Sequence, residues 1–269
     1  MKTQTHNLRA VISTVGIAQA VAVMLFFCLF TGQVQDVEAQ IAVMQYRHVP
    51  AENVQEFVRR ETTYWSAIAE KAIQEDKMMY WAMWQKVGGW NLDTGSNFLF
   101  MNVFADKTGL DNVSGIWDPT TVFPEMNPAD ISTEMLSTTK HMLVVESIAD
   151  AGNEEPQFLR MNYGKVHDPE KTLEIEMNWK TFIEEQMEQG NTTATSWRFV
   201  RVLTPAGASI PFDVISMDGF QSLSEAVYPT WADDVEFPDM TGFDEAQTRD
   251  RVSVYARVKS VSREAESGE

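Results

Sequence analysis

The chain has 269 residues and a formal net charge of −18, and 44% of its residues are hydrophobic. A surface of that charge repels phosphate backbones, which excludes nucleic acid as an expected partner. Cys28 is the single cysteine, so the chain beyond residue 39 has no disulfide, thiolate nucleophile or cysteine-bound metal.

Residues 1–39 are predicted to form a secretory signal peptide. Lys2 and Arg9 precede an apolar run at 10–30, and a polar stretch then ends at Ala39. A basic start, an apolar run and a small-residue cleavage site are typical of export signals. The alternative is a retained membrane anchor, because about 20 apolar residues can span a bilayer. The rest of the chain is expected in the periplasm or outside the cell, free of the membrane once the signal is cleaved.

Residues 41–150 are predicted to form one α+β unit. Its elements in chain order are a strand at 41–49, a helix at 51–74, strands at 80–87 and 97–104, a helix at 131–139 and a strand at 141–148. The strands are bounded by turn residues, and the first helix has apolar residues at helical spacing. This β-α-β-β-α-β order is that of the split ferredoxin-like unit.

The second half of the chain repeats the first at an offset of 114 to 117 residues. The matched positions are Tyr46 and Tyr163, Glu61 and Glu176, Trp81 and Trp197, and the W-x5-F-P-acid-M segments that start at Trp117 and Trp231. The pattern predicts a second unit at 158–262, a linker at 151–157 and a disordered tail at 263–269. Each W-x5-F-P segment is expected to be an ordered loop that covers the barrel mouth or fills its core.

This element order, present in two tandem copies, resembles the dimeric α+β barrel superfamily, which includes antibiotic-biosynthesis-monooxygenase-like proteins. In that superfamily, two ferredoxin-like units pair their sheets into a barrel of eight strands. The resemblance implies an α+β fold in which the two halves of one chain pair, so we expect a monomer with an intrachain pseudo-dimer. Eight strands enclose space for side chains or for one small ligand.

Glu61, Glu176 and His48 are the candidate catalytic residues. The two glutamates lie on the apolar stripe of the first predicted helix of each half. A carboxylate facing the sheet is costly unless it is paired, hydrogen-bonded or protonated. It could serve as an acid/base or ligand acceptor with a raised pKa, or it could make a structural hydrogen bond to a Trp or Tyr.

A set of aromatic and sulfur-containing strand residues is predicted to face the barrel interior, because strand side chains alternate between the two faces. These candidate ligand-binding residues are Tyr46, Trp81, Met83, Tyr163, Trp197 and Phe199, with Lys165 at the rim. Such a lining suits a flat or apolar small molecule. The alternative is that these residues only fill the core.

The sequence therefore predicts an exported protein that binds a small apolar or aromatic molecule in the barrel. The superfamily resemblance implies, as an alternative, a cofactor-independent oxygenase or isomerase that uses Glu61, Glu176 or His48 as its acid/base. A third alternative is a filled structural barrel. No cofactor is predicted, and no metal site is predicted because His48, His141 and His167 lie far apart in the sequence.

Overall fold

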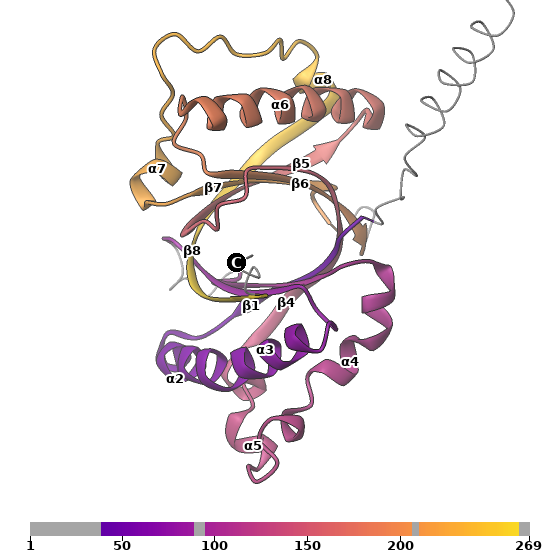
Figure 1. Cartoon of the computed structure of the whole chain (residues 1–269), viewed down its shortest axis with the longest axis vertical. Coiled ribbons are helices and arrows are strands. Elements are labelled where there is room, and N and C mark those ends of the chain that lie inside the picture. The colour runs from indigo at the N-terminus through magenta and orange to yellow at the C-terminus, as the bar shows by residue number, and fades with distance from the viewer. Residues whose placement is uncertain (1–38, 89–94, 206–209, 264–269) are drawn as a thin grey trace, which may run out of the picture. The chain divides into compact units, whose positions relative to one another are not determined.

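The computed structural model describes residues 39–88, 95–205 and 210–263. Eight antiparallel strands close into a barrel in the order β1-β3-β2-β8-β5-β7-β6-β4 (Figure 1). The strands are β1 (Ile41–His48), β2 (Tyr80–Lys86), β3 (Phe98–Phe104), β4 (Thr138–Ala151), β5 (Phe158–Val166), β6 (Ser196–Thr204), β7 (Val214–Phe220) and β8 (Gln247–Ser262). The predicted signal peptide up to residue 38, and residues 264–269 of the predicted tail, lie outside the described residues.

The first half of the chain (β1–β4) and the second half (β5–β8) have the same internal strand order. Within the barrel, β4-β1-β3-β2 is followed by β8-β5-β7-β6, so the fourth strand of each half lies beside its first strand. Two pairs join the halves: β2 with β8, and β4 with β6. Each half therefore supplies part of one continuous closed sheet.

Helices cover the outside of the barrel on two opposite sides (Figure 1). The first half has a 3-10 turn at Ala51–Asn53, then α2 (Val54–Arg60), a π-helical segment at Glu61–Trp65 and α3 (Ser66–Gln74). The second half has one long helix, α6 (Pro169–Gln189). The side chain of Asp168 caps the start of α6, and Gly190 ends it in the left-handed conformation that glycine adopts without strain.

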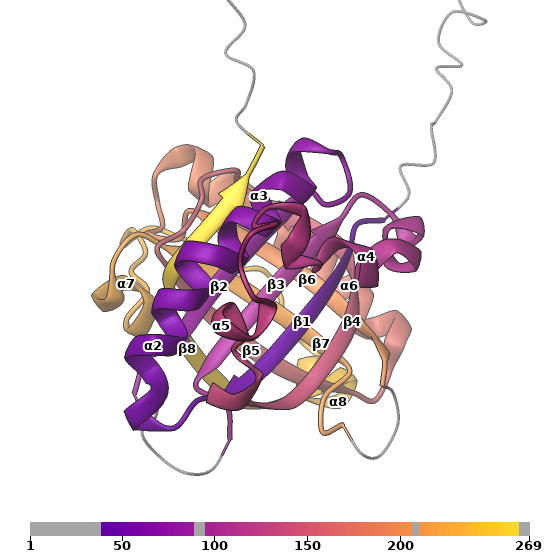
Figure 2. The same cartoon turned by 90° about the horizontal axis from the view of Figure 1, so that it is seen from below.

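Short elements complete each side. They are 3-10 turns at Lys107–Asn112, Pro119–Thr121 and Glu134–Leu136, with α4 (Val113–Ile116), α5 (Pro128–Ile131), α7 (Leu223–Val227) and α8 (Phe243–Ala246). Figure 2 shows α4 and α5 on the same side of the barrel as α2 and α3. No helix in the described part of the chain is both long enough and apolar enough to cross a membrane.

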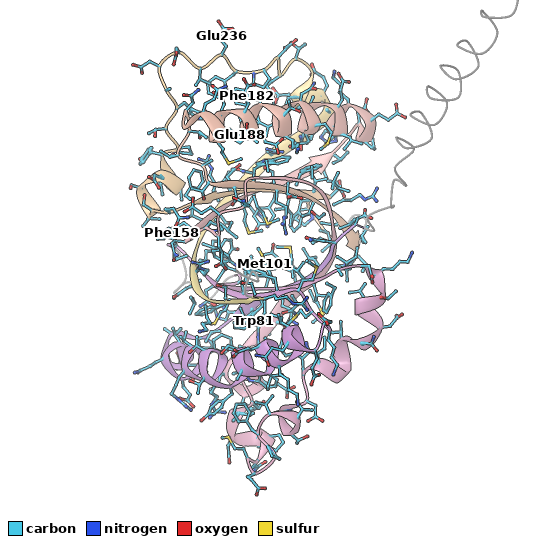
Figure 3. All side chains as sticks on the ribbon, in the orientation of Figure 1. Trp81, Met101, Phe158, Phe182, Glu188 and Glu236 are labelled. Carbon is cyan, nitrogen blue, oxygen red and sulfur yellow. The ribbon has the colours of Figure 1, made fainter. Side chains whose placement is uncertain are left out.

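The apolar side chains form one cluster inside the barrel and one outer cluster under the helices of each half. The inner cluster includes Met44, Tyr46, Trp84, Met101, Leu143, Met161, Tyr163, Met217 and Tyr255. Trp81, Met83 and Phe100 belong to the first outer cluster, and Trp197 and Phe199 belong to the second. Figure 3 shows Met101 inside the barrel and Trp81 between the barrel wall and the helices.

The predicted helix at 131–139 is wrong. Residues 128–136 form only the short helix α5 and a 3-10 turn, and β4 already begins at Thr138. Asn127 caps α5 and Pro128 begins it, but Ser132 then adopts an extended backbone that ends the helix. The strand continues to Ala151, so the segment between the halves begins at Gly152 rather than at residue 151.

Candidate functional site

A cavity of about 700 Å³ lies between the barrel wall and the helical layer of the first half. We call it the first-half cavity. Strand residues of β1, β2 and β3 form its floor, the π-helical segment forms one side, and the segment from Trp117 to Thr139 borders the rest. Its volume is in the range of small-molecule sites.

Glu61 is the buried ionisable residue of this cavity, with only 4% of its surface exposed. Its Oε1 accepts hydrogen bonds from Arg47 Nη1 at 3.1 Å and from Thr133 Oγ1 at 2.7 Å. Burial raises the pKa of Glu61 to about 7, although the charge of Arg47 and the Thr133 hydrogen bond act in the opposite direction. A carboxyl group that titrates near neutral pH can accept or release a proton under physiological conditions.

The helix changes its winding where it carries Glu61. The π-helical segment begins at Glu61 and ends at Trp65, and both residues line the cavity. Such π-turns are rare and are frequently found at functional sites, because the extra residue redirects the side chains around it. In the second half, α6 is a continuous α-helix through Glu176. The local distortion is thus specific to the first-half cavity.

Arg47 fixes a positive charge in the cavity wall. Besides Glu61, its guanidinium donates to Ser137 Oγ at 2.5 Å and lies 5.0 Å from the ring centroid of Phe57. Burial lowers the pKa of Arg47, and the neighbouring Glu61 carboxylate raises it. A guanidinium held between a carboxylate and aromatic rings is well placed to stabilise a second anion in the cavity.

Asn102 supplies a hydrogen-bond acceptor that the protein itself leaves unused. Its surface is 2% exposed and it lines the cavity from β3. Its Oδ1 has no hydrogen-bond partner among the described residues. A buried oxygen without a donor costs about 1–3 kcal/mol. A ligand hydroxyl or amine bound in the cavity would satisfy it.

Aromatic rings form the apolar walls of the cavity. Trp65 and Trp117 are 6.3 Å apart, and Trp81 and Phe100 are 6.1 Å apart, measured between ring centroids. Trp65 Nε1 donates to the Ile131 carbonyl, which fixes the orientation of its ring. These rings leave offset or edge-on positions for a further flat ring.

The second half keeps the buried glutamate but pairs it differently. Glu176 is 2% exposed and accepts hydrogen bonds from Gln247 Nε2 at 2.6 Å and from Arg249. Gly164 occupies the strand position that corresponds to Arg47, and a Cβ there would lie 2.8 Å from Gln247 Oε1. The arginine that pairs with Glu176 therefore comes from β8 instead of β5. In neither half is the hydrogen-bond partner the Trp or Tyr that we expected.

The structure divides the predicted ligand-binding residues among three layers. Tyr46 and Tyr163 face each other inside the barrel, with hydroxyl oxygens 3.4 Å apart. The prediction that Trp81, Met83, Trp197 and Phe199 share this inner face is wrong, because they lie in the outer clusters. On β2 the inward positions belong to Ala82 and Trp84. Apolar residues occupy both faces of this strand, so alternation alone could not show which face is inner.

The remaining candidates lie away from the first-half cavity. His48 is partly buried at the end of β1, and its Nδ1 has no partner among the described residues. Lys165 pairs with Asp213 at 2.9 Å near the same end of the barrel. Of the predicted site residues, only Glu61 and Trp81 meet in this cavity.

Sequence reasoning missed Arg47, Asn102, Thr133, Trp65 and Trp117 as cavity residues. The W-x5-F-P segments were expected at the barrel mouth or in its core, but their tryptophans pack on helix residues instead. Trp117 contacts Trp65, and Trp231 contacts Trp179 with ring centroids 6.1 Å apart. Arg47, a charged residue near the end of the mainly apolar strand β1, was the one signal that could have indicated a buried ion pair.

No protein family matches the sequence, and no curated protein is similar to it. The fold is similar to that of the "putative monooxygenase" of Lactobacillus acidophilus NCFM, with a TM-score of 0.55, 12% identity and coverage of 84% of this chain and 97% of that one. The "putative monooxygenase" of Fusobacterium nucleatum subsp. nucleatum ATCC 25586 gives a TM-score of 0.53, 7% identity and coverage of 85% and 96%. An anthrone oxidase-like protein gives a TM-score of 0.52, 9% identity and coverage of 86% of this chain and 95% of that one. The chain thus has the eight-stranded α+β barrel fold that its resemblance to the dimeric α+β barrel superfamily implied.

Proposed function

We propose that the protein binds a small, flat aromatic molecule in the first-half cavity and that Glu61 accepts a proton from it. The observation that carries this proposal is a buried carboxyl with a pKa of about 7 in a cavity walled by aromatic rings. The binding site differs from the one expected from the sequence, because it lies outside the barrel wall instead of inside it.

The polar groups of the cavity define the chemical class of the ligand. The unused oxygen of Asn102 calls for a donor, and Glu61 calls for an acidic proton. Arg47 would then stabilise the anion that remains after the proton has moved. Phenols and enolisable aryl ketones combine a flat ring with such a proton. A neutral aromatic hydrocarbon offers neither a hydrogen-bond donor to Asn102 nor an acidic proton to Glu61, which then keeps only Arg47 and Thr133 as partners.

Binding of 2-naphthol, followed by quenching of tryptophan fluorescence, tests this proposal. The comparison ligand is 2-methoxynaphthalene, which has the same ring system but no acidic proton. We expect Glu61→Gln to weaken 2-naphthol binding about tenfold or more and to leave 2-methoxynaphthalene unaffected, because a hydrogen bond to a charged group is lost. Glu176→Gln is the matched control and should change neither affinity. If Glu61→Gln lowers the melting temperature while 2-naphthol binds as before, Glu61 is only structural and the proposal fails.

Catalysis is a second candidate function, favoured by the neutral pKa of Glu61. Two of the similar structures carry monooxygenase names and a third is called anthrone oxidase-like. In the corresponding reaction here, Glu61 would remove a ring CH₂ proton from an anthrone, and the resulting anion would be oxidised by O₂ to the quinone with release of one water. Oxygen consumption with anthrone measures this. Glu61→Gln should lower the rate about 10²-fold or more, and equal rates would rule the reaction out.

The proposal has two further parts: the protein is exported, and it is a monomer whose single chain contains two fused α+β units. The basic, apolar and small-residue pattern of residues 1–39 supports export, and the repeated strand order supports two fused units. Fractionation of the source cells with N-terminal sequencing tests the first, and a mature chain that begins at Gln40 is expected. Light scattering tests the second, and a mass of two chains would contradict it.

A further inference from the structure

A second cavity, of about 400 Å³, opens at the end of the barrel where β1 begins and β8 ends. We call it the barrel-end cavity. Its apolar part includes Met101, Leu159 and Met217, which are 8%, 7% and 7% exposed. Met101 lies on β3 and Met217 on β7, and these strands stand on opposite sides of the closed sheet. The thioethers thus reach the cavity from both halves.

Two polar side chains enter the cavity from opposite walls, Tyr80 on β2 and Arg198 on β6. Burial raises the pKa of Tyr80, and the nearby charge of Arg198 is among the influences that lower it. Tyr80 donates to Glu155 Oε1 at 3.2 Å, and Glu155 is also paired with Arg257 at 2.7 Å. Arg198, in contrast, forms no ion pair with any described residue. Arg198 is a partly buried residue, and its guanidinium can therefore bind an anion in the cavity.

We propose that the barrel-end cavity is a second ligand site, which takes a small monocarboxylate with an apolar body. A guanidinium binds a carboxylate through two parallel hydrogen bonds. Methionine side chains are flexible and polarisable, so they adapt to apolar groups of different shape. The volume lies within the range of small-molecule sites. Nothing in the proposed function of the first-half cavity requires this second site.

The acidic groups at the rim set a limit on anion binding. Asp150 is the direct strand partner of Arg198, and it is exposed. Glu155 is neutralised by Arg257, whereas Glu154 lines the cavity without an ion pair to any described residue. The negative charge of Asp150 therefore opposes the binding of a ligand carboxylate at Arg198. Its removal should strengthen binding, in contrast to the removal of Arg198.

The segment that joins the two halves is part of this site. Gly152, Asn153, Glu154 and Glu155 border the cavity. Gly152 has a φ of +71°, and a Cβ there would lie 2.5 Å from the Thr195 carbonyl, so the chain can pass only as glycine. Gln221 Nε2 donates to the Glu155 carbonyl at 3.3 Å. The connection is thereby held across the rim of the cavity.

Octanoate is the probe, and octanol, with the same chain length and no charge, is its control. The full chain is labelled at the methionine methyl groups and observed by carbon-13 NMR. Saturating octanoate should shift the methyl signals of Met101 and Met217. The signal of Met135, which is 92% exposed and borders the first-half cavity, should not move. A shift at Met135 alone, or no shift at all, overturns the proposal.

Calorimetric titration of variants then tests the role of the charge. Arg198→Gln should weaken octanoate binding about tenfold to a hundredfold and leave the affinity for octanol unchanged. Arg201→Gln is the matched control, because Arg201 lies on the same strand but is exposed and pairs with Glu146. Asp150→Asn should strengthen octanoate binding, and it provides a second test if the Arg198→Gln variant does not fold. Octanoate binding that is insensitive to both changes refutes the site. Because 2-naphthol binding should be the same in all these variants, failure here is distinct from failure in the first-half cavity.

Discussion

Replacing Glu61 with glutamine should remove a pH dependence of folding stability between about pH 4.5 and pH 7. The ordinary pKa of a glutamate is 4.5, and burial raises that of Glu61 to about 7 in the folded protein. The folded state therefore holds this proton more tightly than the unfolded chain does. Glutamine keeps the shape of a protonated glutamate and cannot ionise, so it isolates this one effect.

The sign and size of this pH dependence follow from the difference in proton binding by Glu61 between the folded and unfolded states. Below pH 4.5 the carboxyl is protonated in both states, and its contribution to the free energy of unfolding is fully present. Between pH 4.5 and 7 the unfolded chain releases the proton first, so stability falls as the pH rises. At about 1.4 kcal/mol per pH unit, the difference between 4.5 and about 7 amounts to about 3 kcal/mol. The side chain is only 5% exposed, so solvent screening reduces this little.

Urea unfolding of the wild type and Glu61→Gln from pH 4 to pH 8 measures this contribution. All other titrating groups are common to both proteins, so the difference between their free energies of unfolding reports on Glu61. That difference should move by about 3 kcal/mol in favour of the glutamine variant as the pH rises. Thr133→Val removes a hydrogen bond that lowers the pKa of Glu61, so it should extend the window to higher pH. A difference that stays constant from pH 4 to pH 8 would refute the raised pKa.

Three further predictions test other parts of the structure. Asn102→Leu should stabilise the fold by about 1 kcal/mol in urea unfolding, because it removes a buried oxygen without a donor; a destabilised variant would contradict this expectation. Gly164→Ala should cost about 1–3 kcal/mol, because its Cβ would lie 2.8 Å from Gln247 Oε1 and 2.9 Å from Val214, and binding in the first-half cavity should be retained. Tyr163→Phe should lower the melting temperature more than Tyr46→Phe or Tyr255→Phe, because the Tyr163 hydroxyl lies between the other two, at 3.4 and 3.5 Å; equal losses would show that the three hydroxyls do not interact.

The strands of the first half were largely predictable from the sequence. The predicted strands at 41–49, 80–87 and 97–104 match β1, β2 and β3 closely, because each is an apolar run with turn residues at its ends. The burial of Glu61 and Glu176 was also correctly predicted, since both lie on the apolar stripe of a helix. These features depend on local patterns, which a single sequence contains.

The cavity itself was not predictable, because it depends on contacts between distant segments. Thr133 reaches Glu61 from a segment that we expected to be helical, and Trp117 reaches Trp65 from a loop. On β2, where Trp81 faces out and Trp84 faces in, both faces are buried. Period-two alternation disappears in such a strand, so its inner face cannot be assigned from the sequence.

Strand β8 pairs with a neighbouring strand along each of its two edges, and so closes the sheet. β8 pairs with β5 of its own half and with β2 of the first half, and its pairing with β2 extends to Ser262. Until those residues have left the ribosome, β2 has an open edge with unpaired backbone groups, which other chains could pair with. Ring closure must also bring together strands that are far apart in the sequence, which slows folding. The barrel therefore closes only after β8 has been synthesised, and a chaperone that assists this protein is expected to act on a chain that already includes β8.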